Sequence, residues 1–258
     1  MAEQVAGKGD PIKTLELMWG LTRPPKRGPR AKSSVYDIVC AAIHLADAEG
    51  LDAVSTRRVA EKLGISPMSF YTHIPGKAEL LDLMLDAVVG WTGGLAPPTF
   101  RPDDWRENLS AIARSLWEFY LRHPWVLELA THRPVLGPNT MRSAETALSA
   151  LEGLGLDDIE MDRVFNLIAS YVHGAVRDAA REKTVNLQTG MTDNEWWYRV
   201  APYLETIDFS PYPVLSRVGK TAGEAHGAHD PQGAFAFGLE RILDGLALFI
   251  EPKRKALP

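Results

Sequence analysis

The chain has 258 residues, of which 45% are hydrophobic, and its formal net charge is −5 at pH 7. This length suits one or two globular domains with a sizeable core, and no run of about 18 apolar residues is present to span a membrane. The start of the chain lacks the apolar core of a signal peptide. Cys40 is the single cysteine, which excludes an intrachain disulfide and a thiolate metal cluster. We therefore expect a cytoplasmic protein.

The charge is unevenly distributed along the chain. Between Arg23 and Lys77 there are nine basic and five acidic residues, a local charge of +4, whereas residues 94–258 carry seventeen basic and twenty-two acidic residues, a charge of −5. Attraction to phosphate is therefore expected only in the N-terminal part. The charge by itself adds little to a nucleic-acid interpretation, because segments of this charge are common on solvated surfaces.

Residues 1–32 are predicted to form a basic, partly disordered N-terminal arm. It contains a short apolar patch around Trp19, followed by a basic stretch rich in proline and glycine from Arg23 to Lys32. Such a stretch cannot form a regular helix. Two interpretations stay open: an arm that lies along phosphates or in a minor groove, or a solvated tail.

Four helices are predicted in a first domain of residues 33–92. Each has apolar residues at helical spacing, and serine or threonine caps precede the first three. The third is only about two turns long and begins with the pair Ser66-Pro67, a cap followed by a first-turn proline. Their expected bounds are residues 34–50, 55–64, 67–73 and 77–91.

A second domain, residues 93–258, follows a linker at 93–102 that contains three prolines. Its pattern stays helical, with no alternating strand pattern and no internal repeat, so the predicted fold class is all-α. The stretch 210–230, rich in Gly, Pro and His, is predicted to be a mobile loop, and the last helix is predicted to end before Pro252. The expected helical segments are 103–123, 125–131, 139–154, 158–183, 194–206 and 231–251.

The segment from Thr56 to His73 has the pattern of a helix-turn-helix. Ala60 is the small residue that lets the second helix cross the first, and Gly64 tolerates a left-handed turn. Phe70 is the buried apolar residue of the second helix. Short lookalikes of this motif are common, so the pattern alone is moderately specific.

Only a few exposed groups on the second helix can read bases. Ser69 and Thr72 offer hydroxyls, and Pro67 and Met68 offer apolar surface for thymine methyls. Residues at helix starts and the Tyr71 hydroxyl are better suited to phosphates, which set the register on DNA. The predicted DNA-binding residues are Thr56, Arg57, Pro67, Met68, Ser69, Tyr71, Thr72, His73 and Lys77.

Several short motifs lie between Asp47 and Asp86. They are Asp47-x-x-Gly50-Leu, Thr56-Arg-x-Val-Ala-x-x-Leu-Gly-Ile-Ser66, the Met68-x-x-Tyr71 pairing, Tyr71-x-His73, Lys77-x-Glu-Leu-Leu81 and Asp82-Leu-Met-Leu-Asp86. With these motifs, the stretch from Val35 to Val88 resembles the DNA-binding domain of the TetR family of bacterial transcriptional regulators, and within it the branch of the tetracycline repressor. The resemblance is specific over about 55 residues and looser in Arg122-His-Pro124, Gly137-Pro138 and the final helix. The long N-terminal arm departs from the smallest members of the family.

The resemblance implies a N-terminal helix-turn-helix domain joined to a larger helical domain that dimerises and binds a small effector. It implies a repressor released from a palindromic operator, with double-stranded DNA, a second copy and an effector as partners. We expect no membrane attachment, no metal site and no cofactor, and the question whether a divalent metal assists effector binding stays open. The final helix supports dimerisation, because it is apolar on more than one stripe. The expected dimer residues are Phe165, Val172, Val176, Phe235, Leu239, Ile242, Leu246 and Phe249.

Aromatic and polar residues on facing helices are candidates for the effector site. Aromatic residues at helical spacing belong more often to a core than to a pocket, and Tyr171 and His173 fall on different faces of one helix, so at most one need point inward. The candidates are Trp117, Tyr120, Trp125, Phe165, Tyr171, His173 and Trp197.

The alternatives are an enzyme and a non-specific architectural DNA binder. Gly219-Lys220-Thr221 matches the end of a phosphate loop, but Val214 stands where the first glycine belongs. His226 and His229 lack an obvious third metal ligand. The acidic second domain favours a sensor over an architectural protein, and we expect no enzymatic activity.

Overall fold

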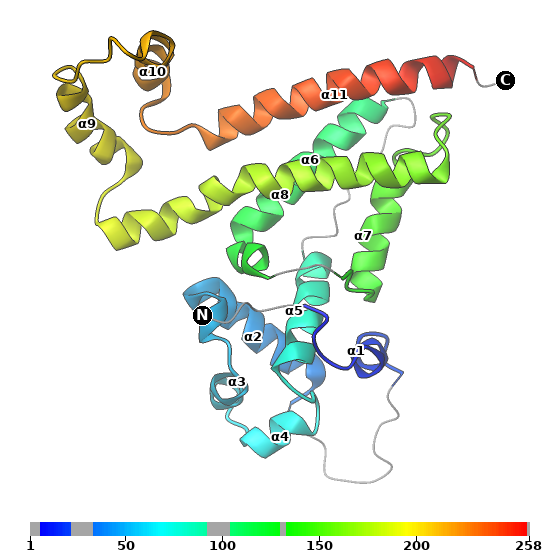
Figure 1. The fold of residues 1–258 in the computed structure, drawn as a ribbon. Helices are drawn as coiled ribbons and strands as arrows, with labels where there is room; N and C mark the ends of the chain where they lie inside the picture. Colours follow the sequence, from blue (N-terminus) through cyan, green and yellow to red (C-terminus); the bar gives the residue numbers. More distant parts are fainter. Residues whose placement is uncertain (1–5, 22–32, 92–103, 130–132, 257–258) are drawn as a thin grey trace.

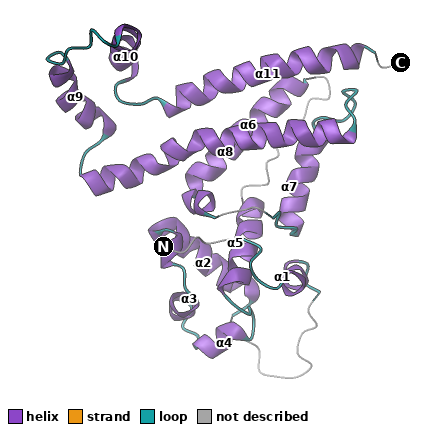
Figure 2. Cartoon of the chain, in the orientation of Figure 1, coloured by secondary structure: helices purple, strands orange, loops and turns teal. Residues whose placement is uncertain are grey.

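The computed structural model describes residues 6–21, 33–91, 104–129 and 133–256. Within these ranges helices joined by loops make up the chain and no strand is present, which confirms the predicted all-α fold (Figure 2). The helices form two bodies, an N-terminal body of α1 to α5 and a C-terminal body of α6 to α11 (Figure 1). The predicted basic stretch at 23–32 and the linker at 93–102 lie outside the described residues.

Polar side chains cap the first four α-helices of the N-terminal body. Ser34 accepts a hydrogen bond from the Asp37 amide while the Asp37 carboxylate accepts one from the Ser34 amide, a capping box. Ser55 and Ser66 cap the next two helices. The elements are α1 (Pro11–Met18), α2 (Val35–Glu49), η1 (Leu51–Ala53), α3 (Thr56–Lys62), α4 (Pro67–Tyr71) and α5 (Lys77–Trp91).

The core of this body lies between α2, α4 and α5. Ile38, Ile43, Phe70, Ile74 and Met84 are fully buried there. Each is a large apolar side chain, and removing such groups from water is the main driving force of folding. This core holds α3 and α4 at the end of the molecule that is farthest from the C-terminal body (Figure 1).

The C-terminal body is organised around one long helix, α8. It packs against both α6 and α11, and α6 also touches α11. In the described ranges, no helix combines the length and the hydropathy that crossing a bilayer requires. The elements are α6 (Trp105–Arg122), η2 (Pro124–Glu128), α7 (Pro138–Ser149), α8 (Asp158–Thr189), α9 (Asp193–Leu204), α10 (Pro213–His226) and α11 (Pro231–Lys255).

One helix was not anticipated, and two expectations about elements were wrong. The apolar patch of the arm contributes to α1, which packs on α5, whereas the predicted loop at 210–230 contains α10. Its glycines argued against a helix, yet Gly223 lies directly against the Trp197 ring of α9 and leaves no room for a larger side chain. The last helix continues through Pro252, because the Lys253 ammonium binds both carboxylate oxygens of Glu160 and anchors the final turn.

Candidate DNA-binding surface and effector domain

The residues of the predicted motif form a tight corner between α3 and α4. Gly64 adopts the left-handed φ of 64° that the turn needs, and the Ile65 amide donates to the Ala60 carbonyl at 3.0 Å. Ala60 and Phe70 are both buried at the crossing of the two helices. Ala60 has the small side chain that close helix crossing requires.

The outer face of α4 is apolar and largely exposed. Met68 is 75% exposed and Pro67 lies beside it at the start of the helix. Ser69 is half-buried, and its carbonyl accepts a 2.6 Å hydrogen bond from the Thr72 hydroxyl, which leaves that hydroxyl able to accept only. The surface therefore offers thymine-sized apolar contacts and few donors.

Tyr71 connects α4 to the start of α3. Its hydroxyl lies 3.3 Å from the Thr56 hydroxyl, and its ring packs edge-on against Phe70. Arg57, beside Thr56 in the first turn of α3, is exposed. These groups stand where the amides and the positive dipole end of α3 favour an anion.

The remaining basic groups of the corner differ in availability. Arg58 is not available for phosphate, because its guanidinium donates to both carboxylate oxygens of Glu49 at 2.9 Å. Partial burial lowers the pKa of Lys77 at the start of α5, an effect that the charge of Asp52 opposes. His73 is half-buried after α4.

Two carboxylates, that of Asp47 and that of the buried Asp86, join the N-terminal body to the C-terminal body. The Asp47 Oδ1 atom on α2 lies 2.8 Å from His123 Nδ1 and accepts a hydrogen bond from Trp125 Nε1 at 2.7 Å. Asp86 on α5 accepts hydrogen bonds from the amides and side chains of Asn139 and Thr140 at the start of α7. A carboxylate at a helix N-terminus is favoured by the dipole, so Asp86 ties α5 firmly to α7.

Aromatic rings from α6, α8 and α11 meet in the C-terminal body. Phe235 stacks on Trp117 and on Tyr171, with centroids 4.4 and 5.9 Å apart, and the Tyr171 hydroxyl donates to the Phe235 carbonyl at 2.8 Å. Tyr120 and His173 meet edge to face at 5.7 Å. Four of the predicted effector residues are thus brought together with Phe235, which the sequence analysis had assigned to the dimer. We call these five residues the aromatic set.

Tyr171 and His173, of which at most one was expected to need to point inward, both contact a neighbouring helix. The two side chains do leave α8 in different directions, but α8 runs between two helices, so Tyr171 meets α11 and His173 meets α6. Burial raises the pKa of Tyr120 to about 12. Burial, and then the charge of Arg177, lowers the pKa of His173.

The other three predicted effector residues lie elsewhere. Trp125 is fully buried at the junction, where its indole is bound to Asp47. Trp197 packs on α10 through Gly223, and Phe165 lies half-buried on α8, six residues before Tyr171. Sequence spacing alone cannot separate these environments, because each depends on which helix comes to lie opposite.

A hollow of about 480 Å³ lies between the end of α8 and the start of α9. Successive steps of three or four residues place Tyr171, Ala179, Glu182 and Asn186 on one face of α8, so the hollow continues the face that begins at the aromatic set. The Asn186 Oδ1 atom is buried and has no hydrogen-bond partner within the described part of the chain. The hollow is lined by Ala179, Glu182, Asn186, Gly190, Met191, Thr192 and Glu195.

Most of the residues expected at a dimer interface are core residues of the single chain. Phe165 and Ile242 are half-buried, and of the eight only Phe249 is exposed. The outward faces of α8 and α11 carry other apolar residues, namely Leu167, Phe237 and Leu248. The expected interface residues that are buried within the chain are Val172, Val176, Phe235, Leu239 and Leu246.

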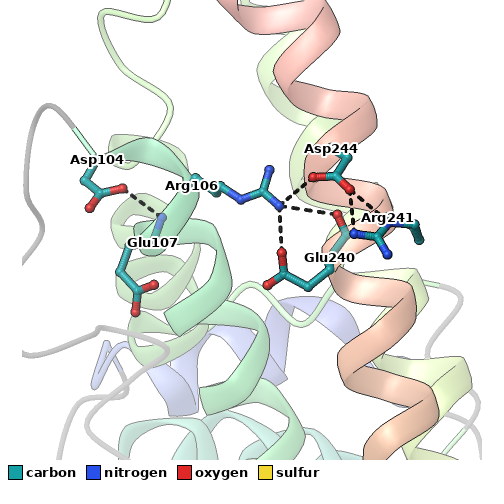
Figure 3. A network of polar contacts seen from close by, with 6 residues as sticks. All are labelled: Asp104, Arg106, Glu107, Glu240, Arg241 and Asp244. Atoms are coloured by element: carbon teal, nitrogen blue, oxygen red, sulfur yellow. Dashed lines mark hydrogen bonds and ion pairs between the residues drawn. The ribbon is translucent and has the colours of Figure 1, made fainter.

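Glycines and charges complete these outward faces. A Cβ atom added to Gly174 on α8 or Gly245 on α11 would meet nothing within 4 Å. Figure 3 shows Arg106 of α6 bound to Glu240 and Asp244 of α11, each at 2.7 Å. Hydrogen bonds from Arg106 and then Arg241 lower the pKa of Asp244. The network fixes α11 against α6.

The residues that the sequence analysis weighed as signs of an enzyme have ordinary structural roles. Gly219-Lys220-Thr221 lies inside α10, where the Thr221 hydroxyl donates to the Arg217 carbonyl. His226 pairs with Asp230 and His229 with Asp178. Among the described residues, no three histidine, cysteine or acidic side chains gather in a way that could hold a metal ion.

The junction carboxylates were missed by the sequence analysis as functional residues. Asp47 and Asp86 were noted only within runs that resemble the family, without a role. A sequence signal existed for α5, because Glu79, Asp82 and Asp86 recur at helical spacing on a face that is otherwise apolar. All three are buried.

Comparison with known proteins gives consistent similarities over nearly the whole chain. The family model described as "Bacterial regulatory proteins, tetR family" matches residues 38–84, and "Tetracyclin repressor-like, C-terminal domain" matches residues 97–250. The HTH-type transcriptional repressor DrrR1 of Streptomyces coeruleorubidus is 40% identical over 97% of this chain and 91% of its own length.

Solved structures of regulatory proteins are also similar to this chain. Apo ActR from Streptomyces coelicolor superposes with a TM-score of 0.69 at 28% identity, over 89% of this chain and 100% of that chain. ActR in complex with actinorhodin has a TM-score of 0.67 at 28% identity, over 83% and 96% of the two chains.

Proposed function

The chain belongs to the tetR family of bacterial regulatory proteins and is a ligand-responsive, DNA-binding transcriptional regulator, and from that premise we propose that it is a homodimeric repressor. It leaves a palindromic operator when a small molecule occupies the C-terminal body. The observation that carries the proposal is the α3–α4 corner, whose body is joined through the carboxylates of Asp47 and Asp86 to a second body with an aromatic interior.

Two groups of residues in the corner contact DNA. Thr56, Arg57, Tyr71, His73 and Lys77 hold phosphates and set the register. The exposed positions of α4 read bases, and because they provide few donors, contacts with thymine methyls carry much of the specificity. The reading residues are Pro67, Met68, Ser69 and Thr72.

The effector lies along the face of α8 that runs from the aromatic set to the hollow at Asn186. Stacked rings favour a flat aromatic ligand, since offset stacking adds to the burial of apolar surface. At the other end, Glu182 and the Asn186 oxygen supply acceptors, so the ligand presents hydroxyl or ammonium donors there. ActR, which this chain resembles, has been solved in complex with actinorhodin and with (S)-DNPA.

The two copies associate through the outward faces of α8 and α11. Leu167, Phe237 and Leu248 supply exposed apolar surface, and the open positions at Gly174 and Gly245 allow another helix to approach closely. The dimer places two α4 helices roughly 34–36 Å apart, in successive major grooves.

The signal passes through the junction. A ligand that changes the positions of α6 and α8 shifts η2 and α7, whose groups bind Asp47 and Asp86. These carboxylates carry the motion into α2 and α5, and the two corners then no longer match the groove spacing. The protein does this in the bacterial cytoplasm, with no enzymatic activity, no membrane attachment and no cofactor besides the effector.

Footprinting on the DNA that flanks the gene tests this function. We expect protection of one short inverted repeat that persists with excess competitor DNA, and loss of protection when a flat aromatic ligand such as actinorhodin is added. A Phe235→Ala variant should keep the footprint and need more ligand to lose it. Protection without sequence preference would contradict the proposal.

A further inference from the structure

The segment at residues 6–21 is bound to α5 by two buried carboxylates. The Gly7 amide donates to Asp82 Oδ1 at 2.7 Å, and the Asp10 amide donates to Glu79 Oε1 at 3.0 Å. Burial raises the pKa of Asp82, while the hydrogen bond from Gly7 opposes that rise. A buried carboxylate that lost its donor would be costly, so α5 depends on this segment for two of its acidic side chains.

The fit between the segment and α5 is close. Gly9 lies against the Glu79 carboxylate, and a Cβ atom at this position would overlap it unless the Glu79 side chain moved. Gly7 adopts a φ of 71°, in the left-handed region that glycine favours. Leu17 and Met18 pack against the core from the α1 side. The segment is therefore built into the N-terminal body.

The same segment reaches the C-terminal body. The Trp19 indole nitrogen donates to the Leu136 carbonyl at 2.9 Å, in the stretch that leads into α7. Asp86, one turn beyond Asp82 on α5, binds the start of that same helix. The segment thus spans the junction beside the Asp86 contact, with contacts on both bodies.

We propose that residues 6–21 are a brace that fixes the N-terminal body on the C-terminal body and so positions the α3–α4 corner for DNA. The proposal rests on the function proposed above, because the position of the corner matters only to a DNA-binding dimer. Trp19 is the positioning residue that holds the C-terminal body, while Glu79 and Asp82 receive the brace on α5.

The distance between the bodies can be measured without DNA and without an effector. Spin labels at Glu61→Cys on α3 and Glu118→Cys on α6, in a Cys40→Ser background, report this distance by pulsed EPR. Labelled protein is diluted with unlabelled protein so that only pairs within one chain contribute. The variants are Trp19→Phe, which removes the one indole hydrogen bond, and a chain lacking residues 1–21.

Two controls separate the brace from other effects. Trp105→Phe removes an equivalent 2.9 Å indole hydrogen bond, to Glu251, within the C-terminal body. Arg27→Ala with Arg30→Ala lowers the charge of the basic stretch and leaves the brace residues intact. Operator affinity and its dependence on salt are measured for the same variants without labels.

We expect a narrow distance distribution for the parent protein, a broader one for Trp19→Phe and the broadest for the truncated chain. Operator affinity should fall about threefold for Trp19→Phe and about tenfold for the truncation, with an unchanged salt slope because the phosphate contacts remain. Trp105→Phe should match the parent in both measurements. Arg27→Ala with Arg30→Ala should keep the narrow distribution.

An unchanged distance distribution in Trp19→Phe and in the truncated chain would overturn the brace. So would a loss of affinity that comes with a shallower salt slope, which would make the segment a phosphate-binding arm. If the truncated chain fails to fold, the distance distribution of Trp19→Phe still tests the brace. A parent protein that binds no operator contradicts the proposed function instead, and the distance measurement still tests the brace.

Discussion

Ser69 and Tyr71 lie two residues apart on α4 but have different surroundings. Ser69 is half-buried on the face that would enter a groove, whereas the Tyr71 hydroxyl lies at the start of α3, beside Thr56. In the proposed function, this difference separates a residue that reads bases from one that binds phosphate.

We expect Tyr71→Phe to weaken binding about three- to tenfold for every operator sequence, since it removes one phosphate contact and keeps the ring on Phe70. Ser69→Ala should instead change which bases are preferred. Gel retardation with a panel of single-base operator variants measures both. Tyr203→Phe, an exposed tyrosine on α9, is the control. Equal losses on all sequences in both variants would refute the division.

His173 should make stability depend on pH. Its pKa in the folded protein lies below the ordinary value of 6.5, because burial and Arg177 disfavour the charged ring. Its contribution to stability is therefore fully present above pH 6.5 and is lost as the pH falls through the folded pKa.

We expect His173→Gln to lose less stability than the parent protein between pH 7 and pH 5. Urea unfolding at the two pH values gives the comparison, since other titrating groups are common to both proteins. An equal loss in both would mean that the imidazole is solvated as well in the folded state as in the unfolded state.

The helices α8 and α11 each have one face that packs inside the chain and one face that is exposed. Their inner faces build the core and the aromatic set, and their outer faces carry exposed apolar residues and open glycines. The apolar excess of the last helix led the sequence analysis to expect an interface, but it could not say which stripe faces inward. Which apolar stripe of α11 faces inward depends on where α6 packs.

A charge on the outer face of α11 should separate the copies. Leu248 is 82% exposed, so Leu248→Glu costs the single chain little but would bury a charge at the interface. We expect half the parent mass in light scattering at micromolar concentration, and loss of operator binding. Leu215→Glu on α10, also strongly exposed, should leave the mass unchanged. A Leu248→Glu protein with the parent mass would exclude this interface.

At the scale of the whole molecule, DNA binding depends on two corners held at one spacing. A rigid dimer matches half-sites one helical turn apart, so the operator geometry reports the geometry of the protein. The junction contacts of Asp47, Asp86 and the brace set that spacing in each chain.

Inserting five base pairs at the centre of the operator should therefore weaken binding about 100-fold, towards the non-specific level, because one half-site turns to the opposite side of the helix. Fluorescence anisotropy with labelled duplexes measures the loss. Replacing five central base pairs without changing the length is the control. Retained affinity for the lengthened site would show that the two corners bind independently.

The all-helical class, the corner between α3 and α4 and the family are predictable from the sequence, because they rest on local signals. Capping serines, Gly64 at the turn and apolar residues at helical spacing act within a few residues of one another. The same local signals misled at α10 and at the end of α11, where Trp197 and Glu160, distant in sequence, decide the outcome.

Which side chains meet depends on contacts between segments that are far apart in the sequence. The partners of Asp47 are 76 and 78 residues away, and the amide that binds Asp82 is 75 residues away. The spacing of residues along a helix says which of them share a face. Which element packs against that face depends on how the whole chain folds. The corner was therefore readable from the sequence, whereas the junction, the brace and the aromatic set were not.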